Sequence, residues 1–288
     1  MATAEDGKAV EVRTEVGLLS HNVRIEGAPQ AGVSPTSVTA RGFGCHVRVE
    51  QIMVGGVLRR GSVELSSVEI VGCGQEASLR HALQFEQVPG GGSYIRGSSV
   101  HSSNAVGIRV KDTPGLEISG TVVHITIGSS IAISRSDSVL VDKTLALSVY
   151  ARIPGTERIS VLANFEMCVY DLETDGVTAP CSGTVLRDST AAGSHHTGVL
   201  MYADDCTSAT RGVVLQGEIV AHSTRAGFLA LGRPDAACAG LAGFTVHHTT
   251  EVGVALPYNA APNVRRCRLT ASKPVLKAPL VSALETKI

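Results

Sequence analysis

The chain has 288 residues, of which 43% are hydrophobic and 18% charged, a composition far from that of a disordered chain. The 25 Lys and Arg against 26 Asp and Glu give a net charge of −1, so no basic excess exists to bind phosphates and nucleic acid is not an expected partner. The chain contains 31 glycines, 3% aromatic residues and no tryptophan. Small and β-branched residues therefore carry its apolar content, which favours many short, tightly stacked strands.

The N-terminus carries no recognisable targeting signal. Residues 1–8 contain neither a basic region nor an apolar core, so they do not form a signal peptide. No apolar run approaches the roughly 18 residues needed to span a bilayer. The sequence therefore predicts no membrane span in this chain.

An internal repeat dominates the region between residues 94 and 149. Three short apolar runs separated by polar corners occur once and then recur in the same order, with a period of about 23 residues. The runs begin at Gly107, Leu116 and Val122, and they recur at Ile131, Val139 and Leu145. Strands this short cannot form a stable unit alone, but stacked on their neighbours they bury one continuous core.

The regular spacing is lost between residues 150 and 193 and then returns with a slightly longer period. Gly198-Val-Leu-Met, Gly227-Phe-Leu-Ala and Gly253-Val-Ala-Leu mark three successive repeats. We therefore expect an all-β chain that forms a single-stranded parallel β-helix, a solenoid with three short strands per coil and about ten coils, over residues 1–270. Residues 150–193 are expected to form an irregular loop insertion, and residues 271–288 a C-terminal tail or cap.

Several blocks of the sequence resemble the fibrocystin and fibrocystin-like family. They are residues 10–27, which contain Glu-Val-Gly-Leu-Leu-Ser-His-Asn-Val, Gly42-Phe-Gly-Cys-His, residues 68–75 and residues 92–103. The resemblance implies a right-handed parallel β-helix from the large ectodomain of a surface protein, often ciliary or secreted. It also implies an extracellular or cell-surface location, and because we find no signal peptide or membrane anchor we expect the chain to be a fragment of a longer ectodomain.

One segment departs from the hyaluronan-degrading relatives of that family. Those relatives carry two histidines just before the block at residues 92–103, where this chain reads Leu83-Gln84-Phe85-Glu86. Glu86 could act as an acid or base only opposite a second carboxylate across a sugar, for which Glu76 and Asp112 are the nearest candidates. Gln84 and Glu86 therefore remain candidate ligand-binding residues.

Histidines recur with the repeat. His101 and His124 are separated by one period of the repeat, and His222 and His248 occupy similar contexts in two later repeats, so each pair is expected to stack on adjacent coils. The pairs suit glycan binding or acid–base chemistry, whereas the alternative is that each fills a polar corner of its coil. Since no Asp or Glu follows at a fixed spacing, no metal site and no cofactor are predicted.

The seven cysteines are widely spaced and include no Cys-x-x-Cys motif. Cys181 and Cys206 bracket a Gly-, Ser- and His-rich stretch that a disulfide between them would close. Free buried thiols are the alternative interpretation.

Two functions remain open. The first is a non-catalytic structural or binding module of an extracellular or ciliary surface protein that presents a lateral face to a polysaccharide or a protein. The second is a carbohydrate-active enzyme, a hydrolase or lyase related to hyaluronidases, in which Glu86, His101 and His124 would converge in one groove. The scarcity of aromatic residues favours the binding module, and the oligomeric state is left open.

Overall fold

The computed structural model describes most of the chain between residues 15 and 256. The described residues are 2–3, 9–10, 15–27, 44–75, 78–150, 162–168, 181–202, 204–205, 213–231, 237–238, 240–242, 244–256, 263–265, 268–270 and 276–277. Within these ranges every element is a β-strand, and no helix long and apolar enough to cross a membrane occurs.

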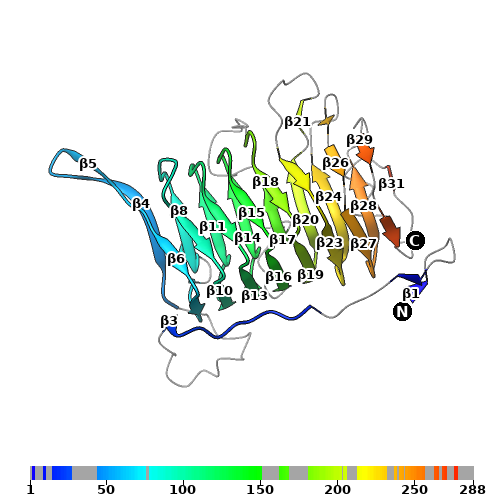
Figure 1. The fold of residues 1–288 in the computed structure, drawn as a ribbon, viewed down its shortest axis with the longest axis horizontal. Coiled ribbons are helices and arrows are strands. Elements are labelled where there is room, and N and C mark those ends of the chain that lie inside the picture. The colour runs from blue at the N-terminus through cyan, green and yellow to red at the C-terminus, as the bar shows by residue number, and fades with distance from the viewer. Residues whose placement is uncertain are drawn as a thin grey trace.

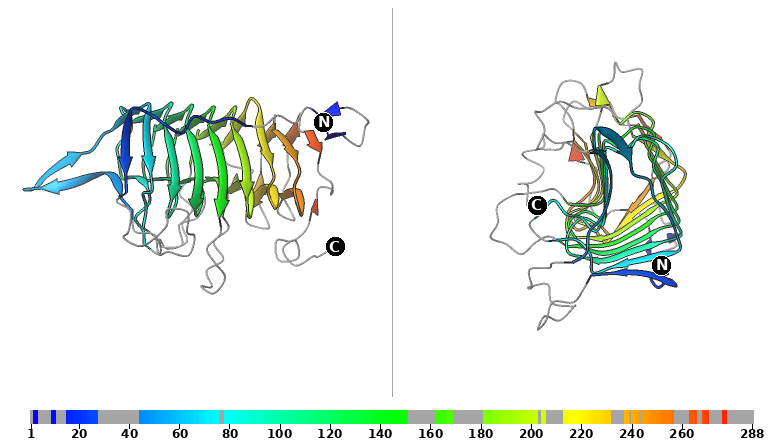
Figure 2. Two further views of the ribbon diagram at one scale, coloured as in Figure 1. Left: turned by 90° about the horizontal axis from the view of Figure 1, so that it is seen from below. Right: turned by 90° about the vertical axis from the view of Figure 1, so that its left-hand side faces the viewer.

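The strands stack into an elongated β-helix whose coils follow one another along the rod (Figures 1 and 2). The nine-stranded sheet has the order β3-β7-β10-β13-β16-β19-β23-β27-β30, with bounds Val23–Glu26, Val68–Val71, Ser99–Ser103, Val122–Ile127, Leu145–Tyr150, Thr190–Ser194, Ile219–His222, Phe244–His247 and Arg268–Thr270. The ten-stranded sheet has the order β31-β28-β24-β20-β17-β14-β11-β8-β4-β5, with bounds Leu276–Lys277, Val252–Leu256, Ala226–Leu231, Thr197–Tyr202, Ala163–Met167, Ile131–Ser134, Ile108–Lys111, Leu83–Glu86, Val47–Val54 and Val57–Arg60. The six-stranded sheet has the order β22-β18-β15-β12-β9-β6, with bounds Val214–Gln216, Val185–Arg187, Leu140–Asp142, Glu117–Ser119, Tyr94–Arg96 and Glu64–Ser66.

Three two-stranded pairs complete the described strands. They are β1 (Ala2–Thr3) with β2 (Ala9–Val10), β21 (Asp204–Asp205) with β25 (Ala237–Cys238), and β26 (Gly240–Ala242) with β29 (Asn263–Arg265).

The register confirms the repeat seen in the sequence. Glu117 pairs with Leu140 and Val122 with Leu145, so the six-stranded and nine-stranded sheets advance by the same amount over this coil. In the ten-stranded sheet Ile131 pairs with Ile108, not with Gly107, so the match expected there was off by one position. The three later repeats also stack in register, on β20, β24 and β28. Since all of these pairs are parallel, the prediction of an all-β parallel β-helix is confirmed.

The core lies inside the coils, where alternate residues of all three sheets meet. In one coil Val100, Val110 and Ile118, one from each sheet, are each at most 1% exposed and belong to a single apolar cluster. Phe165 and Phe228 fill the same interior in later coils. Because alternate residues of a strand point to opposite faces, the other half of each strand points away from this interior.

Buried hydroxyl groups fix the corners between sheets. The backbone N–H of Val88 donates to Oγ1 of Thr113 at 3.2 Å, and the N–H of Thr113 donates to Oγ of Ser136 at 3.0 Å on the next coil. At another corner the N–H of Val68 donates to Oγ of Ser98 at 3.2 Å. These bonds satisfy backbone groups that the sheets cannot pair at a corner.

Residues 150–193 contain regular strands as well as extra chain. β17, β18 and β19 fall in this region and pair in all three sheets, but the chain between the register partners Asp142 and Arg187 is about twice as long as in the preceding coils. Residues 151–161 and 169–180 lie outside the described part, as does most of 271–288, of which Leu276–Lys277 pairs with β28. The insertion and the C-terminal cap therefore stay predictions.

The disulfides differ from the expected pairing. Cys181 is bonded to Cys168, which lies just after β17, with 5.9 Å between their Cα atoms. Cys206 lies outside the described residues, and the predicted Cys181–Cys206 bridge is wrong because the chain returns Cys181 to the end of the strand that precedes it. A second disulfide, not predicted, joins Cys45 to Cys73 across two coils.

Three pairs among the described strands are antiparallel: β1 with β2, β21 with β25, and β4 with β5. β4 and β5 form a hairpin that projects from the first coil beyond the end of the rod (Figure 1). Its turn is Gly55-Gly56, both with positive φ (57° and 79°), which suits the tight turns that match the twist of a hairpin. Parallel strands were expected throughout, and the hairpin was missed because its turn is Gly-Gly and not Asn-Gly.

The segment of residues 15–22 runs along the rod across the outer face of the nine-stranded sheet (Figures 1 and 2). At one end Oε1 of Glu15 lies 2.7 Å from Nε2 of His222 on β23. Toward the other end the N–H of His21 donates to the carboxylate of Glu69 on β7 at 3.4 Å. The segment thus contacts coils far apart in the rod.

Candidate functional site

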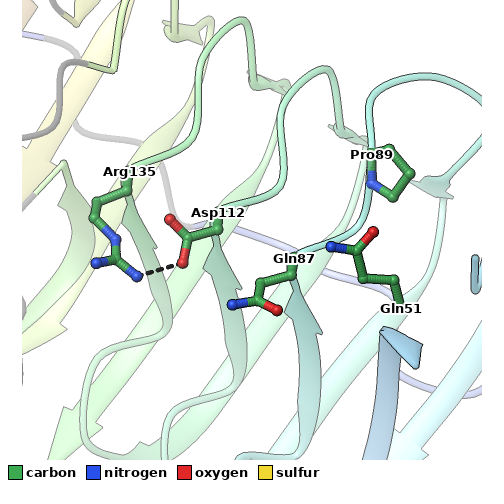
Figure 3. A pocket seen from close by; sticks show the side chains of 5 residues that line it. All are labelled: Gln51, Gln87, Pro89, Asp112 and Arg135. Carbon is green, nitrogen blue, oxygen red and sulfur yellow. Dashed lines mark hydrogen bonds and ion pairs between the residues drawn. The ribbon is translucent and has the colours of Figure 1, made fainter. Parts of the chain in front are cut away.

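A cavity of about 680 Å³ lies at a corner of the rod, where strands of the ten-stranded sheet end. It is lined by Gln51, Gln87, Pro89, Asp112 and Arg135 (Figure 3). The side chains of Asp112 and Arg135 form an ion pair in its wall. We call this cavity the corner groove.

The coil repeat places the polar residues of the corner groove in a row. Gln87, Asp112 and Arg135 each follow directly after a strand, β8, β11 and β14, and they share left-handed φ values of 54°, 49° and 46°. Gln51 comes from β4, the neighbour of β8 in the sheet. Because adjacent strands lie about 4.8 Å apart, the four side chains follow one another at that interval along the rod.

Backbone hydrogen bonds hold the row in place. The N–H of Gln87 donates to the carbonyl of Lys111 at 3.0 Å, and the N–H of Asp112 donates to the carbonyl of Ser134 at 3.2 Å. The corner groove is therefore built on the repeat itself and presents amide, carboxylate and guanidinium groups from four successive coils.

The predicted residues Gln84 and Glu86 lie on β8, next to this groove. They alternate with the core residues Leu83 and Phe85 and so point away from the core, but Gln84 is itself buried, whereas Glu86 is partly exposed. Glu86 accepts hydrogen bonds from Arg48 at 2.9 Å and from Gln84 at 3.0 Å.

His46 extends this outward polar cluster. Its Nε2 lies 3.2 Å from Oε1 of Gln84. Burial lowers the pKa of His46, although the hydrogen bond with Gln84 opposes the shift. The imidazole therefore favours its neutral form.

His101 and His124 are paired in register on β10 and β13, as the spacing predicts. Nε2 of His101 lies 3.1 Å from Oε1 of Glu69. Burial alone would raise the pKa of Glu69, but hydrogen bonds from the His21 backbone and from His101, together with the charge of Arg24, lower it. Burial and then the charge of His101 lower the pKa of His124.

The second histidine pair differs from the prediction by one residue. His222 pairs with His247, not with His248, and the two rings stack with centroids 4.7 Å apart. The nine-stranded sheet advances by one residue fewer at this point than the ten-stranded sheet does, so the expected match with His248 is wrong. His248 follows the strand with a left-handed φ of 50°, and its ring meets His247 edge to face.

The residues of the enzyme hypothesis lie on two different sheets. Glu86 belongs to the ten-stranded sheet, and His101 and His124 to the nine-stranded sheet. Of the carboxylates considered as partners for Glu86, Asp112 is ion-paired with Arg135 and Glu76 lies outside the described residues. In the described ranges no group of three His, Cys, Asp or Glu side chains could hold a metal ion.

Of the groove residues, only Asp112 was identified from the sequence, and Gln51, Gln87, Pro89 and Arg135 were missed. Composition gives no signal for them, because each is an ordinary polar or turn residue. The repeat does give one, since Gln87, Asp112 and Arg135 each lie one position after strand residues that pair in register. These three residues could therefore have been found by extending the repeat one position past each strand, whereas Gln51 lies within β4 and Pro89 lies farther from the end of β8.

No family model matches the chain. Among curated proteins it is 26% identical to human (Homo sapiens) fibrocystin-L over 257 residues, which is 86% of this chain and 6% of that protein. It is 25% identical to mouse (Mus musculus) fibrocystin over 258 residues, 87% of this chain and 5% of that protein. It is also 29% identical to dog (Canis lupus familiaris) fibrocystin over half of this chain and 3% of that protein.

The chain thus spans only a few per cent of the length of these relatives. The aligned region nevertheless covers most of the chain and so most of the β-helix. The family resemblance noted in the sequence blocks is therefore confirmed: this chain is a parallel β-helix similar to fibrocystin and fibrocystin-L.

Proposed function

We propose that the chain is a non-catalytic binding module of an extracellular or ciliary surface protein and that its corner groove binds an extended glycan. The observation that carries this proposal is the row of Gln51, Gln87, Asp112 and Arg135 on four successive coils. The interval between coils is close to the length of one sugar residue in an extended chain. A polymer lying along the rod would meet one polar side chain per sugar.

The chemistry of the groove suits hydroxyl groups. Amides donate and accept hydrogen bonds, and the paired carboxylate and guanidinium of Asp112 and Arg135 offer both functions without a net charge. Among the described residues that line the groove none is aromatic, so binding would rest on hydrogen bonds rather than on stacking against sugar faces. We expect neutral glycans to bind at least as well as acidic ones.

The disulfides support an extracellular location. Cys45–Cys73 and Cys168–Cys181 are both bonded, and such bonds persist in oxidising compartments and are rare in the cytosol. The similarity to fibrocystins agrees with this placement.

The alternative, a hydrolase or lyase acting on a polysaccharide, has less support. It needs an acid and a base within hydrogen-bond reach of one glycosidic bond. Glu86 lies on a different sheet from His101 and His124 and is engaged by Arg48. This arrangement favours retention of a glycan over its cleavage.

The experiment is glycan binding measured with neutral and acidic polysaccharides, hyaluronan included. Because each net hydrogen bond contributes about 1 kcal/mol, the double variant Gln51→Ala/Gln87→Ala should weaken binding by about 10-fold to 30-fold. Gln216→Ala is the matched control, since Gln216 is an exposed glutamine at the end of β22 in the six-stranded sheet. Equal losses in the two variants, or no loss in the double variant, would contradict the proposal.

A further inference from the structure

The β4–β5 hairpin extends beyond the first coil (Figures 1 and 2), and the side chains at its tip are apolar and exposed. Residues 52–58 read Ile-Met-Val-Gly-Gly-Val-Leu and contain no polar side chain. Half of the large, exposed hydrophobic side chains in the described part of the chain belong to this tip: Ile52 (47% exposed), Met53 (63%), Val54 (52%), Val57 (52%) and Leu58 (47%). This concentration is unlike singly scattered surface hydrophobics and marks an interaction site.

Both faces of the tip are apolar. Met53 pairs with Leu58, and these two side chains share one face because opposite residues of an antiparallel pair point the same way. Val54 pairs with Val57 on the other face, next to Ile52. A flat protein surface would cover one of these faces and leave the other in water, whereas an acyl layer surrounds both.

Two arginines stand at the base of the tip. Arg59 is opposite Ile52 and Arg60 is opposite Gln51. Both are exposed, and neither forms an ion pair with another residue of the described ranges. Guanidinium groups at this position would meet lipid phosphates once the apolar tip had entered a membrane.

The dimensions of the tip fit the interfacial zone of a bilayer. From the Ile52–Arg59 pair to the turn is three residues, about 10 Å at about 3.3 Å per residue. Interfacial elements bury their apolar face about 5–10 Å deep. The outer backbone groups of a two-stranded hairpin are unpaired, which restricts the tip to this zone and keeps it out of the hydrocarbon centre.

A second copy of the chain is the competing occupant, and the charges disfavour it. Antiparallel pairing of the free edge of β5 with the same edge of another copy would bring four arginines onto one short seam, because Arg59 and Arg60 make up half of the four-residue strand. Like charges that close together oppose pairing, whereas anionic headgroups complement them.

From these observations we infer that the β4–β5 hairpin docks the rod on an anionic lipid surface. Its tip enters the interfacial zone, and Arg59 and Arg60 contact the phosphates. The corner groove begins at Gln51, the last polar residue of β4 before the tip, so docking holds the first coil close to the membrane. The inference stands independently of the glycan proposal.

The test uses Met53→Trp, because the chain has no other tryptophan. Vesicles of phosphatidylcholine containing phosphatidylserine should shift the tryptophan emission to the blue, and brominated acyl chains should quench it. Adding Arg59→Ala and Arg60→Ala should lower the partition coefficient about 30-fold, equivalent to about 1 kcal/mol for each arginine. The Met53→Trp chain with both arginines intact should bind vesicles of pure phosphatidylcholine about as weakly as the arginine variant binds the anionic vesicles.

Vesicle co-sedimentation of the chain without the tryptophan substitution provides the matched comparison. Met53→Ser/Leu58→Ser should abolish co-sedimentation, whereas Leu79→Ser should retain it although Leu79 is 64% exposed. Circular dichroism should be the same for all variants, because these side chains lie outside the core. Unchanged emission with vesicles, equal effects of the tip and Leu79 variants, or a hairpin-dependent dimer without vesicle binding would each overturn the inference.

Discussion

The imidazole of His247, which stacks on His222, couples the stability of the rod to pH. Burial of His247, and then the charges of His222 and His248, lower the pKa of His247 to about 4, with only partial opposition from Glu15. An unperturbed histidine, as in the unfolded chain, has a pKa of 6.5. Acidification is therefore the perturbation to apply.

The sign and size follow from the two pKa values. Because the pKa of His247 is lower in the folded state, the unfolded chain takes up the proton first as the pH falls. The stabilisation that arises from this difference in pKa is complete above pH 6.5 and is lost as the pH falls toward 4. The free energy of unfolding should decrease by about 2 kcal/mol on going to about pH 5 and by about 3 kcal/mol in full. Burial also lowers the pKa values of His46, His124 and His196, so they act in the same direction.

Urea denaturation followed by circular dichroism at about pH 8 and about pH 5 measures this loss. His247→Leu should remove about 2 kcal/mol of the difference between the two conditions. Leucine suits the site, because the same sheet position holds a leucine in an earlier coil. The register partners along the nine-stranded sheet run from Leu147 through Ala192 and His222 to His247. His195→Gln, at an exposed ring that contacts Tyr150, is the control and should keep the wild-type difference. An unchanged pH dependence in His247→Leu would refute the reasoning.

Two further stability predictions follow from the core and the disulfides. Phe165→Ala removes a side chain with 0% exposure and should lower the free energy of unfolding by about 3–5 kcal/mol, measured by the same denaturation; a loss below about 1 kcal/mol would mean that Phe165 is not in the core. Cys168→Ser removes a disulfide between residues 13 apart in the sequence and should lower the free energy of unfolding by about 3 kcal/mol. Mass spectrometry after thiol alkylation should find Cys181 alkylated in the Cys168→Ser variant. A Cys181 that is still disulfide-bonded in this variant would contradict the pairing.

The fold was predictable because side chains that are buried in the core recur at the same positions of successive coils. Each strand contributes one or two inward residues such as Ile118, and its register partner Val141 must fill the same layer one coil later. Stacked layers of this kind impose a regular apolar spacing that survives in the sequence. Extra chain between strands disturbs the spacing without disturbing the sheets, as at β17 and β18.

The site was harder to predict, because the three sheets advance independently. His222 aligns with His247 and not with His248, since a spacing taken from the ten-stranded sheet does not hold for the nine-stranded one. A difference of one residue moves a side chain to the opposite face of a strand. Disulfide partners are likewise not fixed by spacing: Cys45 meets Cys73 because two coils stack, a contact that only the register reveals.

The most direct test of the central claim, that the chain retains glycans without cutting them, records both events in one experiment. The chain is incubated with hyaluronan and with neutral polysaccharides, with and without divalent metal, and both retention and polymer length are measured. We expect retention with unchanged length, and weaker retention for Gln51→Ala/Gln87→Ala. Shortening of the polymer that disappears in Glu86→Gln or His124→Ala would contradict the account and identify an enzyme.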